Sequence, residues 1–294
     1  MSTRTGPNRL ILYSCLLPTF ALTIFTAIIP LVLAFYYSFF DWMGGPMKPV
    51  GLLNYINLLN DSIFWQSLKN NIIIVGMCSV GHLVPAFILA VLLSGRWMKL
   101  RAVYRFCIFL PVVLSPIVVG FIWRMIYNSK YGLLNAALKA LGLQELIYPY
   151  LDRPETVILF ATFPIVWQYI GLYMVIFLAS IQGIPEDILN VAELDGASNL
   201  QRARHIVFPL TYETIKVAIL LSISGNMKVF DHIYSLTSGG PGNASTVLAM
   251  YAYKSTFTMM KVSYGSAISI STLVISLMII LLSRVLMRKN YSEN

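Results

Sequence analysis

The sequence is poor in charged residues. Only 11% of the chain is charged, whereas 57% is hydrophobic. A soluble domain is usually about a quarter charged, so this composition excludes an ordinary soluble protein and predicts an integral membrane protein in a lipid bilayer. The formal net charge is +9. However, no basic stripe interleaved with aromatic residues occurs, so nucleic acid is not an expected partner.

Cysteine is also scarce. The chain contains Cys15, Cys78 and Cys107. All three lie in apolar runs, and their spacing does not match a metal site or a redox motif. They are therefore expected to be small side chains that are buried or face lipid.

The sequence lacks the motifs that would let it hydrolyse ATP. A phosphate-binding loop needs G-x-x-x-x-G-K-[ST], and no Gly-Lys pair occurs in the chain. The H-E-x-x-H and G-x-S-x-G patterns are missing too. His82, His205 and His232 lie in different segments, which gives no support for a metal site. The chain is therefore not expected to be an enzyme or to bind a cofactor, and ATP and Mg²⁺ would bind a partner.

Long apolar runs are what the sequence has in abundance. They predict an all-α, polytopic membrane protein with six transmembrane helices in a single transmembrane domain, residues 1–294, whose core covers roughly 67–286. The first run is too long for a signal peptide and lacks a small-residue cleavage site. The six predicted helices are Leu10–Phe40, Ser67–Leu93, Phe106–Tyr127, Val157–Ile181, Thr211–Leu236 and Val262–Ser283.

Three predictions concern local detail between and within these helices. Pro111 and Pro116 should kink the third helix, as prolines do in membrane helices when neighbours satisfy the freed carbonyls. The polar loop after this helix should carry one short helix, Leu133–Leu141. Residues 237–260, rich in Gly, Ser and Thr, are expected to form a loop.

The distribution of Lys and Arg predicts the orientation. These residues are more frequent in the termini and in the second and fourth loops than in the other three loops. Because cytoplasmic loops carry the excess of positive charge, both termini and the segment after the fourth helix should face the cytoplasm. The protein is therefore expected in the cell membrane as a multi-pass protein.

The segment Gly183–Leu210 is polar and yet has the pattern of ordered structure. Pro185 suits the first turn of a helix, and Asp195–Gly196 is a turn pair. Ser198 and Gln201 fit a capping box at the start of a second helix. The segment should therefore form a helix, a sharp turn and another helix on the cytoplasmic side.

One face of the first helix in this segment is apolar. Ile188, Leu189 and Ala192 share it and would fit a groove on a partner. Gly196 and Ala197 have almost no side chain, so another backbone could approach them closely. The alternative is an amphipathic helix lying on lipid headgroups.

Polar residues in the apolar fourth and fifth helices are candidates for a substrate path. Asn226, Lys228 and Asp231 follow a long uncharged run, where charges are costly and usually face a cavity. The alternative is a local Lys228–Asp231 pair at i, i+3 near the outer interface, or a lysine side chain that snorkels to that interface. Gln168 and the pair Asn70–Asn71 are weaker candidates, and hydrogen bonding between helices is the alternative role for them.

The predicted outer loop contains Gly239, Gly240, Pro241 and Asn243. Glycine and proline give its backbone unusual turn conformations, and the loop has no chemistry of its own.

The polar segment resembles the signature loop of permease subunits of binding-protein-dependent ABC importers. That loop has the pattern E-A-A-x-x-D-G-A followed by I-x-x-P. The matching positions here are Asn190, Val191, Ala192, Asp195, Gly196, Ala197, Ile206 and Pro209. Asn190 stands where the family has a glutamate, Val191 where it has an alanine, and Ala203 where a phenylalanine is common.

The resemblance extends over nearly the whole chain. It is similar to the carbohydrate branch of these permeases, which includes the maltose, lactose and glycerol-phosphate permeases. The segments that carry this similarity are VGLLNYINLLND (Val50–Asp61), FLPVVLSPIVVGFIWRMIYN (Phe109–Asn128), KVFDHIYSLTSGGPGNAST (Lys228–Thr246) and YGSAISIS (Tyr264–Ser271).

The resemblance implies a transport subunit for a sugar or oligosaccharide. The polar segment would dock on a dimer of cytoplasmic ABC ATPases. A second, homologous permease would complete the pathway, and the outer loop would meet an extracytoplasmic substrate-binding protein. A glycerol-phosphate-type or other polar solute is an alternative cargo, which Lys228 keeps open. A membrane enzyme would need clustered carboxylates, which this sequence lacks. An ATP-independent carrier or channel would be expected to have two related halves, and the sequence shows no such repeat.

Overall fold

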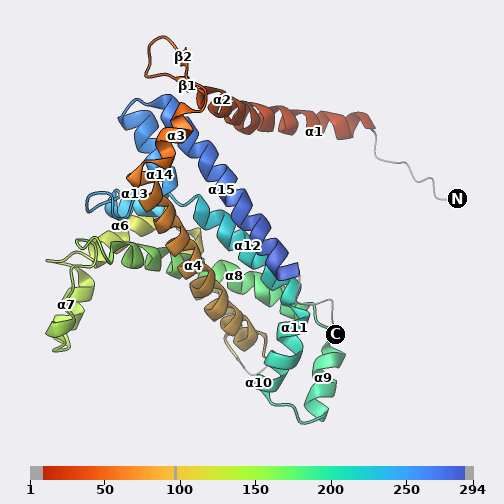
Figure 1. Ribbon diagram of the computed structural model, residues 1–294. Coiled ribbons are helices and arrows are strands. Elements are labelled where there is room, and N and C mark those ends of the chain that lie inside the picture. The colour runs from red at the N-terminus through yellow and green to blue at the C-terminus, as the bar shows by residue number, and fades with distance from the viewer. Residues whose placement is uncertain (1–8, 96–97, 289–294) are drawn as a thin grey trace. The chain divides into compact units, whose positions relative to one another are not determined.

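The computed structural model describes residues 9–95 and 98–288. This part of the chain is predominantly helical, with one short antiparallel strand pair in which Phe40 lies opposite Pro49. The all-α prediction is therefore confirmed. The elements, labelled in Figure 1, are α1 (Arg9–Thr23), η1 (Ile24–Ile28), α2 (Ile29–Tyr37), β1 (Phe40–Asp41), β2 (Lys48–Pro49), α3 (Leu53–Leu59), α4 (Ser62–Ser94), α5 (Arg101–Val113), α6 (Pro116–Ile126), α7 (Leu133–Ala140), η2 (Gln144–Leu146), α8 (Val157–Gln182), α9 (Glu186–Leu194), α10 (Asn199–Arg202), η3 (Ala203–Val207), α11 (Phe208–Leu210), α12 (Tyr212–Met227), α13 (Asp231–Thr237), α14 (Leu248–Tyr253), η4 (Lys254–Thr258) and α15 (Val262–Arg288).

The chain divides into two compact units. Unit 1 comprises the residues up to Asp61 together with Ala252–Ser271, and unit 2 comprises Ser62–Tyr251 together with the residues from Thr272 onward. The sequence alone predicts a single transmembrane domain and gives no sign of this division.

Four helical stretches are long and apolar enough to cross a membrane, judged by length and composition within the described residues. They are Leu16–Tyr37, Ser62–Ser94, Val157–Gln182 and Val262–Met287. The number rises to six if each of two bent helix pairs counts as one span. A polytopic membrane protein is thus confirmed, although two of the predicted spans are not single helices.

The predicted third helix is broken rather than kinked. α5 and α6 meet at an angle of 97°, and the residues between them, Leu114 and Ser115, have extended backbone. Pro111 and Pro116 each remove a backbone N–H from this region, so the helical hydrogen bonding cannot continue through it. The short helix that follows is confirmed as α7.

The predicted fifth helix is wrong in its extent. α12 ends at Met227 and α13 begins at Asp231, with three residues between them. At its other end, α12 meets the stretch Asn199–Leu210 at 70°. The expectation of a plain loop over 237–260 is also wrong, because this region holds α14 and η4. The apolar residues from Val247 to Tyr253 account for α14, since most of them are buried.

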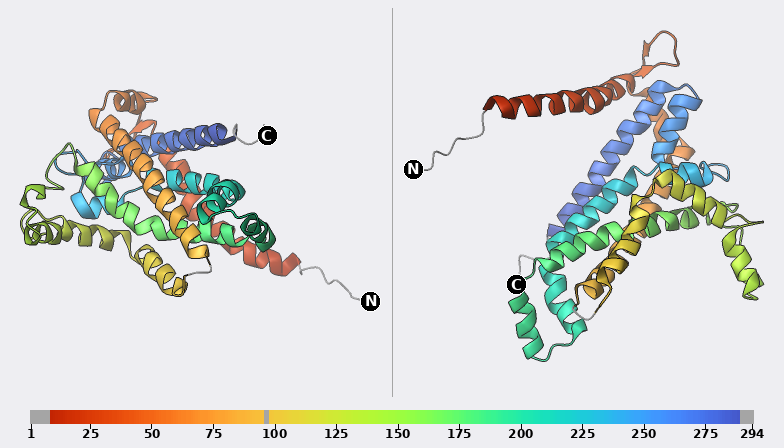
Figure 2. Two further views of the ribbon diagram at one scale, coloured as in Figure 1. Left: turned by 90° about the horizontal axis from the view of Figure 1, so that it is seen from below. Right: turned by 180° about the vertical axis from the view of Figure 1, so that it is seen from behind.

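The core of unit 2 is built around α4 and α8, which pack together along much of their length and cross in Figures 1 and 2. Gly171 on α8 admits the backbone of α5, because a Cβ there would lie 2.3 Å from the Ile108 oxygen. Two groups of buried apolar residues fill the unit. One includes Ile74, Ile165 and Ile233, and the other includes large side chains such as Phe177.

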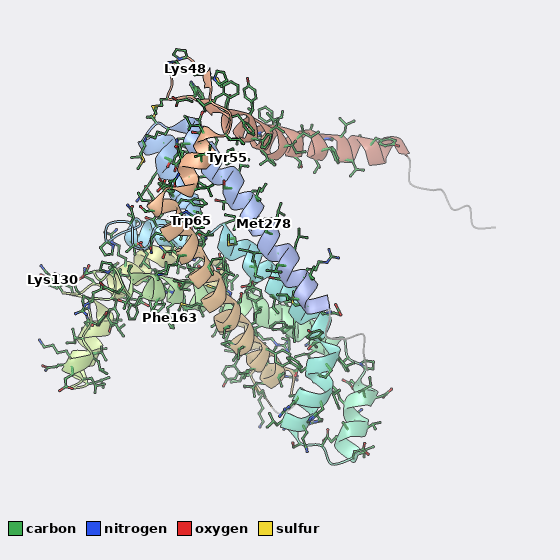
Figure 3. All side chains as sticks on the ribbon, in the orientation of Figure 1. Lys48, Tyr55, Trp65, Lys130, Phe163 and Met278 are labelled. Carbon is green, nitrogen blue, oxygen red and sulfur yellow. The ribbon has the colours of Figure 1, made fainter. Side chains whose placement is uncertain are left out.

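Many apolar side chains remain on the surface, as a bilayer environment requires. Trp65 on α4 and Phe163 on α8, labelled in Figure 3, are about half exposed. In unit 1, none of the residues in the most apolar stretch of the span Leu16–Tyr37 is buried. Cys78 is buried and Cys107 is exposed, which matches the two environments expected for them, while the side chain of Cys15 lies outside the described residues.

Candidate coupling segment and substrate path

The segment Gly183–Leu210 forms a helical hairpin at the end of unit 2 where α8 finishes and α12 begins (Figures 1 and 2). Its first helix, α9, ends in a Schellman motif. The Ala197 N–H donates to the Ala192 oxygen at 2.9 Å, and the Gly196 N–H donates to the Glu193 oxygen at 3.1 Å. Gly196 has φ +79°, a conformation that glycine adopts without strain. The predicted turn at Asp195–Gly196 is confirmed.

The second arm of the hairpin begins with the predicted capping box. The Ser198 N–H donates to the Gln201 side-chain oxygen at 2.7 Å, and the Gln201 N–H donates to the Ser198 hydroxyl at 3.3 Å. Each of these two backbone amides at the helix start, which have no helical partner, thus donates to the side chain of the other residue. The capping box is confirmed.

An ion pair that sequence reasoning missed joins the two arms. The Arg202 guanidinium donates to the Glu193 carboxylate at 2.8 Å and also to the side-chain oxygen of Asn199. The side chain of Glu193 is 69% exposed and that of Arg202 is 24% exposed. Glutamate and arginine nine positions apart do not fit the i, i+4 spacing of a helical pair, so no sequence pattern signalled this contact.

The outward face of the hairpin differs from the expected one. Ala192 is buried, and Leu189 packs against the core of unit 2. Of the three residues predicted to form the docking face, only Ile188 is exposed. The apolar side chains that join it on the open surface are Val191, Leu194 and Leu200, with exposed fractions of 57%, 88% and 78%.

The remaining residues of the signature pattern lie around this hairpin. Asp195 is exposed, Ala197 is half-buried, and Asn190 lines a cavity of about 700 Å³ between the hairpin and the end of α4. Ala203 also lines that cavity and begins the π-helical turn η3. Ile206 and Pro209 are half-buried on the arm that leads into α12.

The predicted substrate-path residues gather at the break between α12 and α13. Lys228 caps α12 and Asp231 opens α13, and both are exposed. The Lys228–Asp231 ion pair considered as the alternative does not form in the described structure, where Lys228 follows the last residue of α12 and Asp231 is the first residue of α13. Asn226 is buried and donates to the Ser222 oxygen at 2.8 Å.

Gln168 is buried and links three elements. Its side-chain nitrogen donates to the Leu114 oxygen at the break between α5 and α6, at 2.8 Å. Its side-chain oxygen lies 2.6 Å from His232 Nε2 on α13. The alternative predicted for Gln168, hydrogen bonding between helices, is what the structure contains.

Two histidines that are far apart in sequence converge in the core of unit 2. Tyr169 contacts both rings edge to face, with its ring centre 6.0 Å from His82 and 5.9 Å from His232. His82 also stacks on Tyr173 and lies 3.2 Å from the Ile165 oxygen. Sequence reasoning treated these histidines as unrelated, since nothing in their spacing signals this long-range contact.

Asn70 and Asn71 are both buried and bind backbone groups from other elements. Asn70 donates to the oxygens of Ala244 and Thr246 at 2.7 and 2.8 Å. Asn71 donates to the last carbonyls of α12, at Asn226 and Met227, and accepts from the Leu248 N–H. These two side chains therefore connect α4 with the outer loop and with the end of α12.

The outer loop is a closely bonded turn with an open tip. Ser245 closes it: its N–H donates to the Gly239 oxygen at 3.2 Å and its hydroxyl to the Gly240 oxygen at 2.6 Å. Gly239 is buried and Pro241 is half-buried, whereas Asn243 at the tip is exposed.

The comparisons with known proteins agree with this geometry. Residues 84–290 match the family described as "Binding-protein-dependent transport system inner membrane component". The probable ABC transporter permease protein YurN of Bacillus subtilis is 37% identical over 273 residues, which cover 92% of this chain and 93% of that protein. The trehalose/maltose transport system permease protein MalF of Thermococcus litoralis is 32% identical over 90% of this chain and 89% of its own length.

A solved structure shows the same fold. The crystal structure of a bacterial ABC transporter involved in the import of the acidic polysaccharide alginate contains a chain that matches with a TM-score of 0.84. The match has 22% identity and covers 96% of each chain. Taken together, the hairpin, the membrane spans and these relatives show that the chain is a multi-pass protein of the cell membrane and belongs to the family of binding-protein-dependent transport system inner membrane components.

Proposed function

We propose that this chain is the permease subunit of an ABC importer that translocates a sugar or oligosaccharide. The observation that carries this proposal is the nature of the relatives that match most of the chain. They include the trehalose/maltose permease of T. litoralis. They also include a probable permease for starch degradation products from Thermoanaerobacterium thermosulfurigenes, which is 31% identical over 85% of this chain.

The energy for transport would come from a dimer of cytoplasmic ATPases, which would bind the ATP and Mg²⁺. The hairpin Gly183–Leu210 would dock on them. Two features support this role: the sequence has no phosphate-binding loop, and the exposed side chains Leu194 and Leu200 flank an open glycine turn. Exposed apolar side chains around a backbone without side chains form a surface that fits a groove on a partner.

The substrate would pass the break between α12 and α13, and a second, homologous permease would provide the other wall. Breaks in membrane helices are tolerated where the irregular backbone lines a cavity or is buried in protein. Lys228 and Asp231 bring polar groups to this break. The exposed loop tip at Asn243 would receive the extracytoplasmic binding protein. In a second solved relative with a TM-score of 0.80 and 22% identity, the alginate transporter is in complex with a pentasaccharide-bound periplasmic protein.

An anionic cargo is the second candidate. Lys228 is exposed and forms no ion pair with Asp231 in the described structure, so its ammonium group is available to a carboxylate, sulfonate or phosphate on the solute. A negatively charged sugar or a glycerol phosphate would use this group, whereas a neutral oligosaccharide would not need it.

The test is reconstitution of the chain in proteoliposomes with its second permease and ATPase, together with a binding protein loaded with either a neutral or an anionic sugar. ATP hydrolysis that rises with the loaded binding protein, accompanied by sugar uptake, is the expected result. Uptake without ATP would instead support a carrier. In the same assay, a Lys228→Gln variant that loses only anionic uptake would establish the second candidate.

A further inference from the structure

The pair Asn70–Asn71 connects the outer loop to the helix break on the substrate path. Both side chains are buried, with exposed fractions of 1% and 0%. Buried amides in a membrane protein are expensive unless every polar group finds a partner. All the partners of Asn71 are backbone groups that lie more than 150 positions away in the sequence.

Asn71 satisfies two helix ends at once. Its amide nitrogen donates to the oxygens of Asn226 and Met227, each at 3.3 Å, where α12 finishes. Its amide oxygen accepts the Leu248 N–H at 2.9 Å, where α14 begins. Helix ends leave carbonyl and N–H groups without helical partners. A single side chain therefore ties the end of α12 to the start of α14.

Asn70 holds the stretch of chain just before α14. Its amide nitrogen donates to the Ala244 oxygen at 2.7 Å and to the Thr246 oxygen at 2.8 Å. Its amide oxygen accepts from Gln66 one turn earlier on α4. Asn70 and Asn71 are neighbours on α4, so the outer loop and the end of α12 before the break are both hydrogen-bonded to the same turn of this helix.

We propose that Asn71 is a positioning residue that transmits docking of the binding protein at the loop tip to the break between α12 and α13. This inference rests on the proposed function. A displacement of the loop moves the Leu248 N–H and pulls on the Asn71 amide. The same amide holds the last two carbonyls of α12, next to Lys228. Asn70 has the different task of shaping the loop that the binding protein meets.

The two residues therefore predict different kinetic defects. Asn71→Asp keeps the size and the acceptor for Leu248 but replaces the nitrogen that donates to the two carbonyls. Per assembled complex, we expect the maximal hydrolysis stimulated by the loaded binding protein to fall about tenfold, because a buried acceptor loses its donor. The concentration of binding protein that gives half of this maximum should change less than twofold. Asn70→Asp should instead raise that concentration.

The experiment uses the complete complex in proteoliposomes, with the amount of assembled complex measured by size-exclusion chromatography. Asn60→Asp, at an exposed asparagine that bonds only within its own helix end, is the matched control and should behave as the unsubstituted chain. Hydrogen exchange over residues 226–231 and 244–248 gives an independent readout. On adding loaded binding protein, both segments should change in the unsubstituted chain, but only the second in Asn71→Asp.

Three outcomes would overturn the proposal. Normal maximal stimulation in Asn71→Asp would show that the amide transmits nothing. A reduced yield of complex with normal activity per complex would show a purely structural role. If the unsubstituted complex shows no stimulation by any loaded binding protein, the proposed function itself fails and this inference falls with it.

Discussion

The hairpin Gly183–Leu210 and the links across the core of unit 2 are held together in opposite ways. The hairpin uses partners within nine positions of each other, as in the Ser198–Gln201 capping box and the Arg202–Glu193 pair, and these groups are exposed or half-buried. The core links join partners far apart in sequence, such as Gln168 with His232 and Asn71 with Leu248, and these groups are buried. The hairpin therefore has a shape fixed by local chemistry, whereas the core depends on the whole unit having folded.

This difference matters for function because the two regions would tolerate change differently. An exposed local contact contributes little to stability and can be replaced by water. A buried long-range contact leaves unsatisfied polar groups when it is lost. Substitutions in the hairpin should therefore affect coupling more than stability, and substitutions in the core should affect both.

Gly196→Asp should uncouple transport from ATP hydrolysis. The glycine has φ +79°, and a Cβ there would meet nothing within 4 Å in this chain, so only the partner would encounter the new carboxylate. We expect uptake in proteoliposomes to fall by at least about tenfold, which corresponds to about 1.4 kcal/mol, while the protein still inserts in the membrane. Gly142→Asp is the matched control, because Gly142 also has a positive φ and open space around it but lies outside the hairpin. Normal uptake in Gly196→Asp would contradict docking at the turn.

Gly171→Ala should disrupt the packing of α5 on α8. The added Cβ would lie 2.3 Å from the Ile108 oxygen and 2.8 Å from the Phe109 Cα, and backbone atoms cannot rotate away. We expect a loss of about 2 kcal/mol in the free energy of unfolding, measured by denaturation in detergent. Gly76→Ala provides the control, since its Cβ meets nothing and alanine favours a helix. Equal stability of the two variants would show that α5 and α8 are not closely packed in the protein.

These two glycines also show how far the sequence alone can predict the structure. The Gly196 turn was predicted because Asp-Gly followed by a capping box is a local signal. The close approach at Gly171 was not, because its partner, the Ile108 carbonyl, lies in another helix and no local pattern reveals it. The six apolar runs were found by composition, but the breaks after Val113 and Met227 were missed or underestimated, since a hydropathy pattern continues through a break that tertiary contacts support.

In the candidate site, too, the sequence indicates individual residues but not the contacts that they make with distant segments. Their depth in an apolar run makes Lys228 and Asp231 candidates for the substrate path, and this role stays a prediction. The local pair considered as their alternative does not form in the described structure, because Lys228 follows the end of α12 and Asp231 begins α13. Gln168 was found as a polar residue in an apolar run, but its contact with His232 depends on the folded arrangement of α8 and α13.

Gln168→Met should have a moderate effect on stability. It removes the donor to the part-buried Leu114 oxygen and the acceptor for the buried His232 ring. Leaving one such buried group without a partner costs about 1–3 kcal/mol, so the apparent melting temperature in detergent should fall clearly. Gln144→Met, at an exposed residue of η2, is the control and should leave it unchanged. If both variants melt alike, the Gln168 link contributes nothing to the fold.

Glu193→Gln should have the smallest effect and separates two roles for this carboxylate. As an exposed partner of Arg202 it should contribute no more than about 0.5 kcal/mol, so the melting temperature should hardly change and uptake should stay within about twofold of normal. The side chain of Glu193 nevertheless stands 69% exposed one turn from Asn190, the position at which the permease signature pattern that this segment resembles has a glutamate. If uptake falls as far as in Gly196→Asp while Arg202→Gln transports normally, the carboxylate of Glu193 acts on the ATPase and not on Arg202. The function of the hairpin would then depend on a contact outside the chain. Its local hydrogen bonds and ion pair would account for the shape of the hairpin but not for its function, unlike the long-range contacts of the core.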